Sequence, residues 1–148
     1  MTTLTNAQTR EKFAKRISLL TTHTKNRWGR MSVEEMVAHL NAAFEVSFGR
    51  IQMTPQKTLM RLAPLKFLLI YVVPWPKGKA RAPREYLPPP QKHLESEKSR
   101  LIDLIEEFAQ TNPANLNAPH PLFGKMTARQ WDALHRKHLE HHLTQFGV

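Results

Sequence analysis

The sequence contains no cysteine among its 148 residues. This absence excludes disulfide bonds, thiolate metal sites and a cysteine nucleophile, so any metal site must use nitrogen and oxygen ligands. The sequence also lacks long hydrophobic runs, since the longest, Phe67 to Val73, is far too short to cross a bilayer. The polar N-terminus lacks the apolar core of a signal peptide. We therefore expect a cytoplasmic protein with no membrane partner.

Acidic residues are few, 12 against 22 basic ones, which gives a formal net charge of +10. The basic residues are spread along the chain, with one local concentration at Lys77, Lys79, Arg81 and Arg84. Such an excess can attract nucleic acid, a membrane surface or anionic small molecules. Nucleic acid is not the expected partner, because no recognised motif accompanies the charge. We expect a solvated basic surface or an anionic small-molecule substrate.

No segment shows the period-two alternation of a strand, whereas several have the spacing of a helix. The predicted core helices span about residues 6–21, 32–48, 91–110 and 127–146. Residues 56–72 are apolar and predict a further helix that Pro64 bends or starts. The chain length fits one domain. The fold class predicted is all-α, a four-helix bundle over residues 1–148.

Two helix starts repeat one pattern of aromatic, glycine, base, methionine and hydroxyl residue. Ser32 with Glu35, and Thr127 with Gln130, have the spacing of a capping box. The local sequence therefore predicts where the second and the last core helix begin.

The connection between the second and third core helices is rich in proline. Residues 73–90 hold six of the 11 prolines, which predicts a long irregular crossover. Loops of this length in compact domains are often functional covers or mobile segments.

The last predicted helix carries four histidines in eight residues, His135, His138, His141 and His142. On a helical wheel, His138 and His142 lie within roughly 20° of the centre of its apolar stripe. Two imidazoles one turn apart that face a hydrophobic interior can bind one metal ion. The alternative is a pair of core histidines hydrogen-bonded to neighbours, because buried polar groups must be satisfied. We expect His141 at the rim.

A metal site would need a third ligand from another helix. His39 is the one remaining histidine well inside a predicted helix. The wheel places it roughly 100° from the centre of the apolar face, at its border. That position fits a ligand that reaches across the bundle, and it fits a half-exposed surface histidine equally.

Three segments resemble the DinB/YfiT-like superfamily: Trp28-Gly-Arg-Met-Ser, Met36-Val-Ala-His39-Leu and Lys137-His138-Leu-Glu-His-His142-Leu-Thr-Gln145. The segment His120-Pro-Leu-Phe-Gly-Lys-Met-Thr and the closing Gln145-Phe-Gly-Val are similar to a branch of unknown function within it. The resemblance covers nearly the whole chain. It implies a DinB-like four-helix bundle that binds one divalent metal through three histidines.

By this resemblance, the metal ligands are His39 from the second core helix and His138 and His142 from the fourth. Many members follow the last ligand with Arg-Gly-Gln, whereas here Leu143-Thr144-Gln145 follows. The glutamine is retained, but the arginine and glycine are not, so this chain lacks whatever those two residues contribute to orientation or substrate binding in such members.

Three neutral imidazoles leave coordination positions open, as in catalytic metal sites. Zinc or nickel is the expected divalent transition metal, with iron and manganese as alternatives, because imidazole alone does not select the ion. The resemblance implies a transferase in which a metal-activated low-molecular-weight thiol attacks an electrophile, or a metal-dependent hydrolase. The alternative is a non-catalytic bundle that binds metal or a small molecule. The resemblance also allows a homodimer.

The sequence offers no clear general base. His135 lies about 40° off the apolar stripe, where it is the candidate acid/base or an orienting residue of the cavity. A structural role in the core fits that position as well. Glu34, Glu35 and Asp103 are further candidates.

Overall fold

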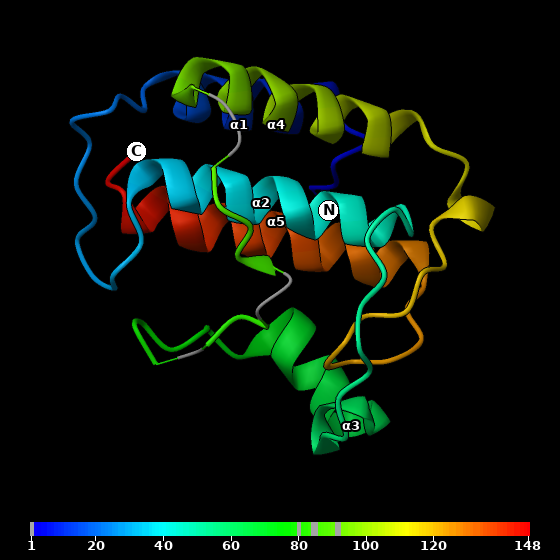
Figure 1. Cartoon of the computed structure of the whole chain (residues 1–148). Helices are drawn as coiled ribbons and strands as arrows, with labels where there is room; N and C mark the ends of the chain where they lie inside the picture. The colour runs from blue at the N-terminus through cyan, green and yellow to red at the C-terminus, as the bar shows by residue number, and fades with distance from the viewer. Residues whose placement is uncertain (1, 80, 84–85, 91–92) are drawn as a thin grey trace.

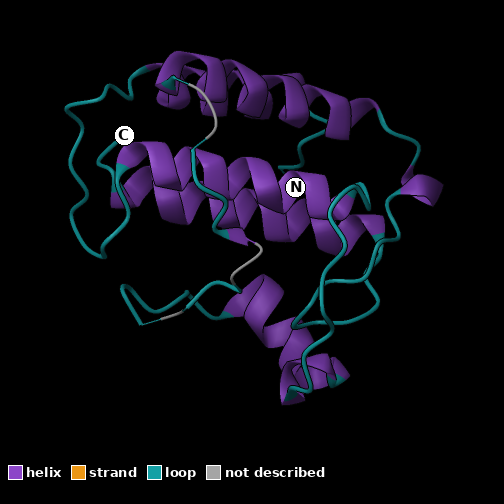
Figure 2. Cartoon of the chain, in the orientation of Figure 1, coloured by secondary structure: helices purple, strands orange, loops and turns teal. Residues whose placement is uncertain are grey.

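The computed structural model describes residues 2–79, 81–83, 86–90 and 93–148. Within these ranges the chain is all-helical and contains no strand, as the sequence predicts (Figure 2). The helices are α1 (Ala7–Ser18), α2 (Val33–Ser47), α3 (Ala63–Phe67), α4 (Leu94–Gln110) and α5 (Ala128–Gln145). Across the described residues, no helix is both long and apolar enough to cross a membrane.

The four long helices lie side by side in two layers, α1 with α4 and α2 with α5 (Figure 1). α2 packs against both α4 and α5, and α1 also contacts these two helices. Of the 15 residues of α2, 13 are buried, which is typical of a helix surrounded by others. α2 is therefore the central helix, and a polar side chain on almost any of its faces lies inside the protein.

Capping boxes define the starts of α2 and α5. The Ser32 hydroxyl accepts the backbone N–H of Glu35, whose carboxylate accepts the N–H of Ser32. Thr127 and Gln130 exchange the same two bonds. These bonds satisfy amide groups that the first helical turn leaves without partners. The starting residues of α2 and α5, the two helices that carry the candidate ligands, are thus set by these capping residues.

The apolar segment 56–72 is not one helix. A 3-10 turn (Leu59–Arg61) precedes α3, and a π-helical turn (Leu68–Val72) follows it. Pro64 lies in the first turn of α3, where a missing amide hydrogen is tolerated, so it starts the helix and does not bend it. The described part of the following crossover is irregular, as predicted. The predicted start of the third core helix at residue 91 lies outside the described residues, and α4 begins at Leu94.

Ser32→Ala and Thr127→Ala should each lower the free energy of unfolding by about 1 kcal/mol, because an N-terminal amide loses its acceptor. Urea denaturation measures the change. Ser99→Ala is the control, because Ser99 is an exposed residue inside α4 and alanine favours helix there. An equal loss in all three variants would contradict the capping roles.

Candidate metal centre

Three imidazoles meet between α2 and α5. One ring nitrogen from each of His39, His138 and His142 lies within 4.8 Å of those of the other two. Nε2 of His39 is 2.7 Å from Nε2 of His138, and the ring centroids of His39 and His142 are 4.9 Å apart. His39 is only 4% exposed, so it is not the half-exposed surface residue that the wheel left open. We name these three residues the histidine cluster.

The crossover fixes the orientation of His39. Nδ1 of His39 lies 2.6 Å from the backbone carbonyl oxygen of Tyr86. A carbonyl oxygen only accepts, so Nδ1 carries the proton and donates. Nε2 is then the nitrogen with the lone pair, and it faces the centre of the cluster.

Gln145 fixes His142 in the same way. The side-chain amide nitrogen of Gln145 donates to the carbonyl oxygen of Trp28 at 2.7 Å. This bond turns Oε1 of Gln145 toward Nδ1 of His142, at 2.7 Å. Nδ1 of His142 must therefore donate, which leaves Nε2 as its lone-pair nitrogen. Gln145 thus orients a histidine of the cluster.

All three imidazoles are neutral near pH 7. Burial lowers the pKa of His39 to about 4 and that of His142 to about 3, against a smaller opposing effect of their hydrogen bonds. Burial, followed by repulsion from His39 and His142, holds the pKa of His138 well below its usual range. A neutral imidazole keeps one nitrogen with a lone pair, so no imidazolium has to lose its extra proton before a metal binds.

The spacing of His39 and His138 fits a divalent ion. Nitrogens bound to one ion at about 2.0–2.1 Å lie roughly 3 Å apart, close to the 2.7 Å between His39 and His138. The same separation suits an N–H···N hydrogen bond between core histidines, so distance alone does not separate the two interpretations. Nδ1 of His39 and Nδ1 of His142 each donate to a protein oxygen. This favours a metal site over a hydrogen-bonded core pair, because imidazole ligands commonly donate the N–H of their second nitrogen to an acceptor.

His135 lies apart from the cluster's shared centre. It is 1% exposed, and its ring stacks on Phe44 at 3.9 Å between centroids. Its Nε2 has no hydrogen-bond partner, and burial lowers its pKa to about 3. These contacts favour packing over proton transfer, and the acid/base role stays a prediction. Of the other candidates, Glu35 is used in the capping box and Asp103 is exposed on α4.

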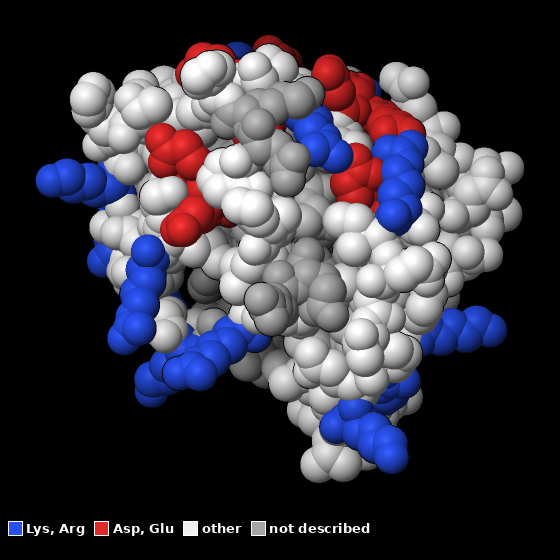
Figure 3. Space-filling view, in the orientation of Figure 1, with Lys and Arg blue, Asp and Glu red and all other residues white. Residues whose placement is uncertain are grey.

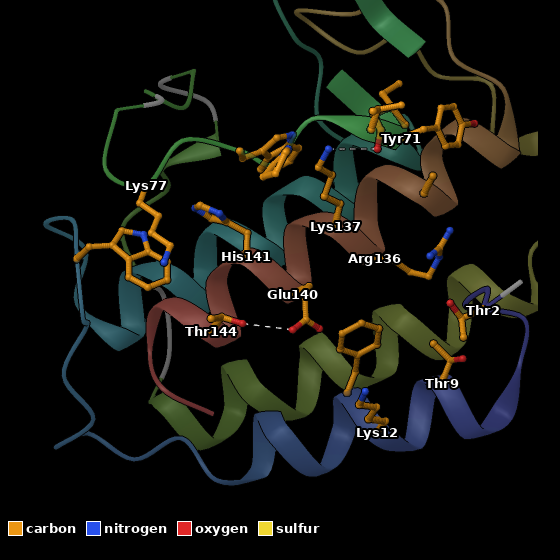
Figure 4. A pocket seen from close by; sticks show the side chains of 17 residues that line it. Thr2, Thr9, Lys12, Tyr71, Lys77, Arg136, Lys137, Glu140, His141 and Thr144 are labelled. Atoms are coloured by element: carbon orange, nitrogen blue, oxygen red, sulfur yellow. Dashed lines mark hydrogen bonds between the residues drawn. The ribbon is translucent and has the colours of Figure 1, made fainter. Parts of the chain in front are cut away.

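A pocket of about 630 Å³ opens beside the cluster (Figure 4). Its wall includes Lys137 and His141 of α5 and Trp75 of the crossover. The ring centroid of Trp75 is 5.5 Å from that of His138 and 5.8 Å from that of His141. Trp75 therefore lies against the cluster on the side of the pocket, and His141 lies on the rim as predicted.

Lys137 holds this part of the crossover in place. Its ammonium group donates to the carbonyl oxygens of Leu69 at 2.7 Å and Val73 at 2.5 Å, just before Trp75. Neither this role nor that of the Tyr86 carbonyl is predictable from the sequence, since backbone acceptors in irregular segments have no side-chain signature. The proline-rich crossover predicted as a functional cover thus supplies both an orienting group and an aromatic wall.

Comparison with known families places the whole chain in one of them. A family model described as "Protein of unknown function (DUF1569)" matches residues 2–147. Comparisons with curated proteins and with solved structures gave no match. Since the family match spans nearly every residue, the chain belongs to the DUF1569 family.

Proposed function

We propose that the protein binds one divalent transition metal through His39, His138 and His142 and uses it to activate a small nucleophile. This proposal rests on three buried neutral imidazoles that lie close together. In two of them, His39 and His142, a hydrogen bond from Nδ1 fixes the ring. A divalent ion there would lower the pKa of a thiol or a water and so supply a nucleophile at neutral pH. Zinc and nickel suit the nitrogen donors best, with iron and manganese as alternatives.

We further propose that the fold is a DinB-like four-helix bundle. The order of the long helices supports this, as do the crossover between α2 and α4 and the histidines on the second and fourth long helices. The reaction favoured by that likeness is transfer of a low-molecular-weight thiol to an electrophile, with metal-dependent hydrolysis as its competitor. The homodimer stays a prediction.

The pocket suggests the chemistry of the substrate. Lys77 is exposed on the pocket wall, with its ammonium group 4.7 Å from the ring centroid of Trp28 (Figure 4). Arg136 also lines the pocket but is paired with Asp132 at 2.9 Å, and Lys137 is engaged by backbone carbonyls. Lys77 and the exposed Lys12, which also lines the pocket, are therefore the cations available to pair with an anionic group, while the indole rings suit an apolar portion.

A non-catalytic metal-binding protein is the second candidate. The observation in its favour is burial, because none of the three histidines is among the residues that line the described pocket. A substrate would have to move Trp75 to reach them, whereas a metal-sensing or structural role needs no such access.

The first prediction concerns metal content. Protein purified without a nickel column should hold about one equivalent of metal by elemental analysis, the stoichiometry of a single three-histidine site. His39→Ala, His138→Ala and His142→Ala should each lose most of it, because two imidazoles rarely hold an ion tightly. His23→Ala, which removes an exposed histidine, is the control. Wild-type protein that takes up neither zinc nor nickel would overturn the metal site.

The second prediction concerns Gln145. Gln145→Ala should weaken zinc affinity by roughly 10–100-fold, because the ring of His142 loses the acceptor that orients it. Competition with a chelating dye measures the change. Gln110→Ala, at an exposed glutamine that ends α4, should leave the affinity unchanged. Equal affinities in the two variants would show that the hydrogen bond to His142 does not support metal binding.

The third prediction concerns turnover. Metal-loaded protein screened with thiols and anionic electrophiles should show activity that His138→Ala abolishes. Lys77→Ala should raise KM more than it lowers kcat, because Lys77 lines the pocket but does not touch the histidine cluster. Stoichiometric metal without turnover in thiol-transfer and hydrolysis screens would favour the non-catalytic candidate.

A further inference from the structure

The segment around α3 exposes an unusual amount of apolar surface. Among the described residues, nine large hydrophobic side chains are exposed, and seven of them fall between residues 59 and 73. We name these seven the apolar patch: Leu59, Leu62, Phe67, Leu68, Tyr71, Val72 and Val73. Single exposed hydrophobic residues are common, but a concentration of this kind marks an interaction surface.

The patch is exposed because its helical turns bury few of their own side chains. In α3 and the π-helical turn only Lys66 and Ile70 are buried. The ammonium group of Lys66 donates to the carbonyl oxygen of Lys125, and Ile70 is 2% exposed in the core. Figure 1 shows α3 lying outside the two layers of long helices. The remaining apolar side chains thus have no layer of this chain to cover them.

The charge around the patch has one sign. Residues 46–84 contain eight of the 22 basic residues and none of the 12 acidic ones, so the rest of the chain has a net charge of only +2. The exposed basic residues of this stretch include Lys57, Arg61, Lys77, Lys79 and Arg81, whereas Arg84 lies outside the described residues. On the face shown in Figure 3, the Asp and Glu side chains all lie in the upper part, with a few Lys and Arg among them, whereas the lower part, with α3 and the crossover, shows Lys and Arg alone.

We propose that the apolar patch docks the protein on the surface of an anionic lipid bilayer. Leucine, phenylalanine and tyrosine side chains flanked by lysine and arginine suit the boundary between acyl chains and anionic headgroups. A second copy of the chain fits less well, because a symmetric contact would bring two strongly basic faces together. The expectation of no membrane partner rested on the lack of a spanning segment, which peripheral docking does not need. The proposal is independent of the metal.

Vesicle flotation tests the proposal. The full chain should bind vesicles of phosphatidylcholine with about one third phosphatidylserine, bind pure phosphatidylcholine weakly, and be released by salt. The triple variant Leu62→Ser, Phe67→Ser, Val72→Ser should lose at least about tenfold in partitioning, because apolar side chains no longer enter the interface. Leu19→Ser is the matched control, since Leu19 is 64% exposed but lies outside the patch, and its binding should not change.

A charge variant tests the basic rim separately. Lys79→Glu with Arg81→Glu should lower partitioning into the anionic vesicles by on the order of twentyfold or more, since each basic residue near the surface contributes roughly fivefold. Lys25→Glu reverses a charge at another exposed position and should have a smaller effect. Unchanged circular-dichroism melting in all variants shows that they fold.

Three outcomes would overturn the proposal. The first is absence of binding to the anionic vesicles at low salt. The second is an equal loss of binding in the triple variant and in Leu19→Ser. The third is a dimer by light scattering that the triple variant converts to a monomer, because the patch would then be covered by a second copy of the chain.

Discussion

Three imidazoles are buried between α2 and α5, and each of their ring nitrogens needs a hydrogen-bond partner or a metal. The surrounding structure depends on this requirement. Desolvation keeps them neutral, and a neutral imidazole still presents one donor and one acceptor nitrogen that each require a partner. The Tyr86 carbonyl and the Gln145 amide accept the outer protons of His39 and His142. With these donors used, Nε2 of each ring is left as an acceptor, and acceptor nitrogens gathered from three histidines are what a cation stabilises.

This requirement explains why two irregular segments, the crossover and the loop before α2, place backbone carbonyls beside the helices. The Tyr86 carbonyl comes from the proline-rich crossover, and the amide of Gln145 is itself held by the carbonyl of Trp28, in the loop before α2. Lys137 binds the carbonyls of Leu69 and Val73, which positions the next part of the crossover over the cluster. Two loops distant in sequence thus contribute backbone oxygens, and these need no particular side chain.

Periodicity and capping motifs predicted the long helices and the inward position of His138 and His142, because α5 has one buried face. The same method gave an ambiguous answer for His39, since a wheel assumes one buried face and α2 is buried on nearly all sides. The role of the Tyr86 carbonyl could not be predicted, because any residue supplies that atom. For residues 56–72 the apolar sequence predicts a helix but not which side is buried, and most of its large apolar side chains face outward.

The departure from Arg-Gly-Gln after His142 does not remove the features that the candidate site needs. Leu143 is fully buried in the core, so an arginine there would face the hydrophobic interior and not the pocket. Cationic groups reach the pocket instead from Lys12 and Lys77. The glutamine has a geometric task that neither neighbour shares, because its amide must contact both Trp28 and His142.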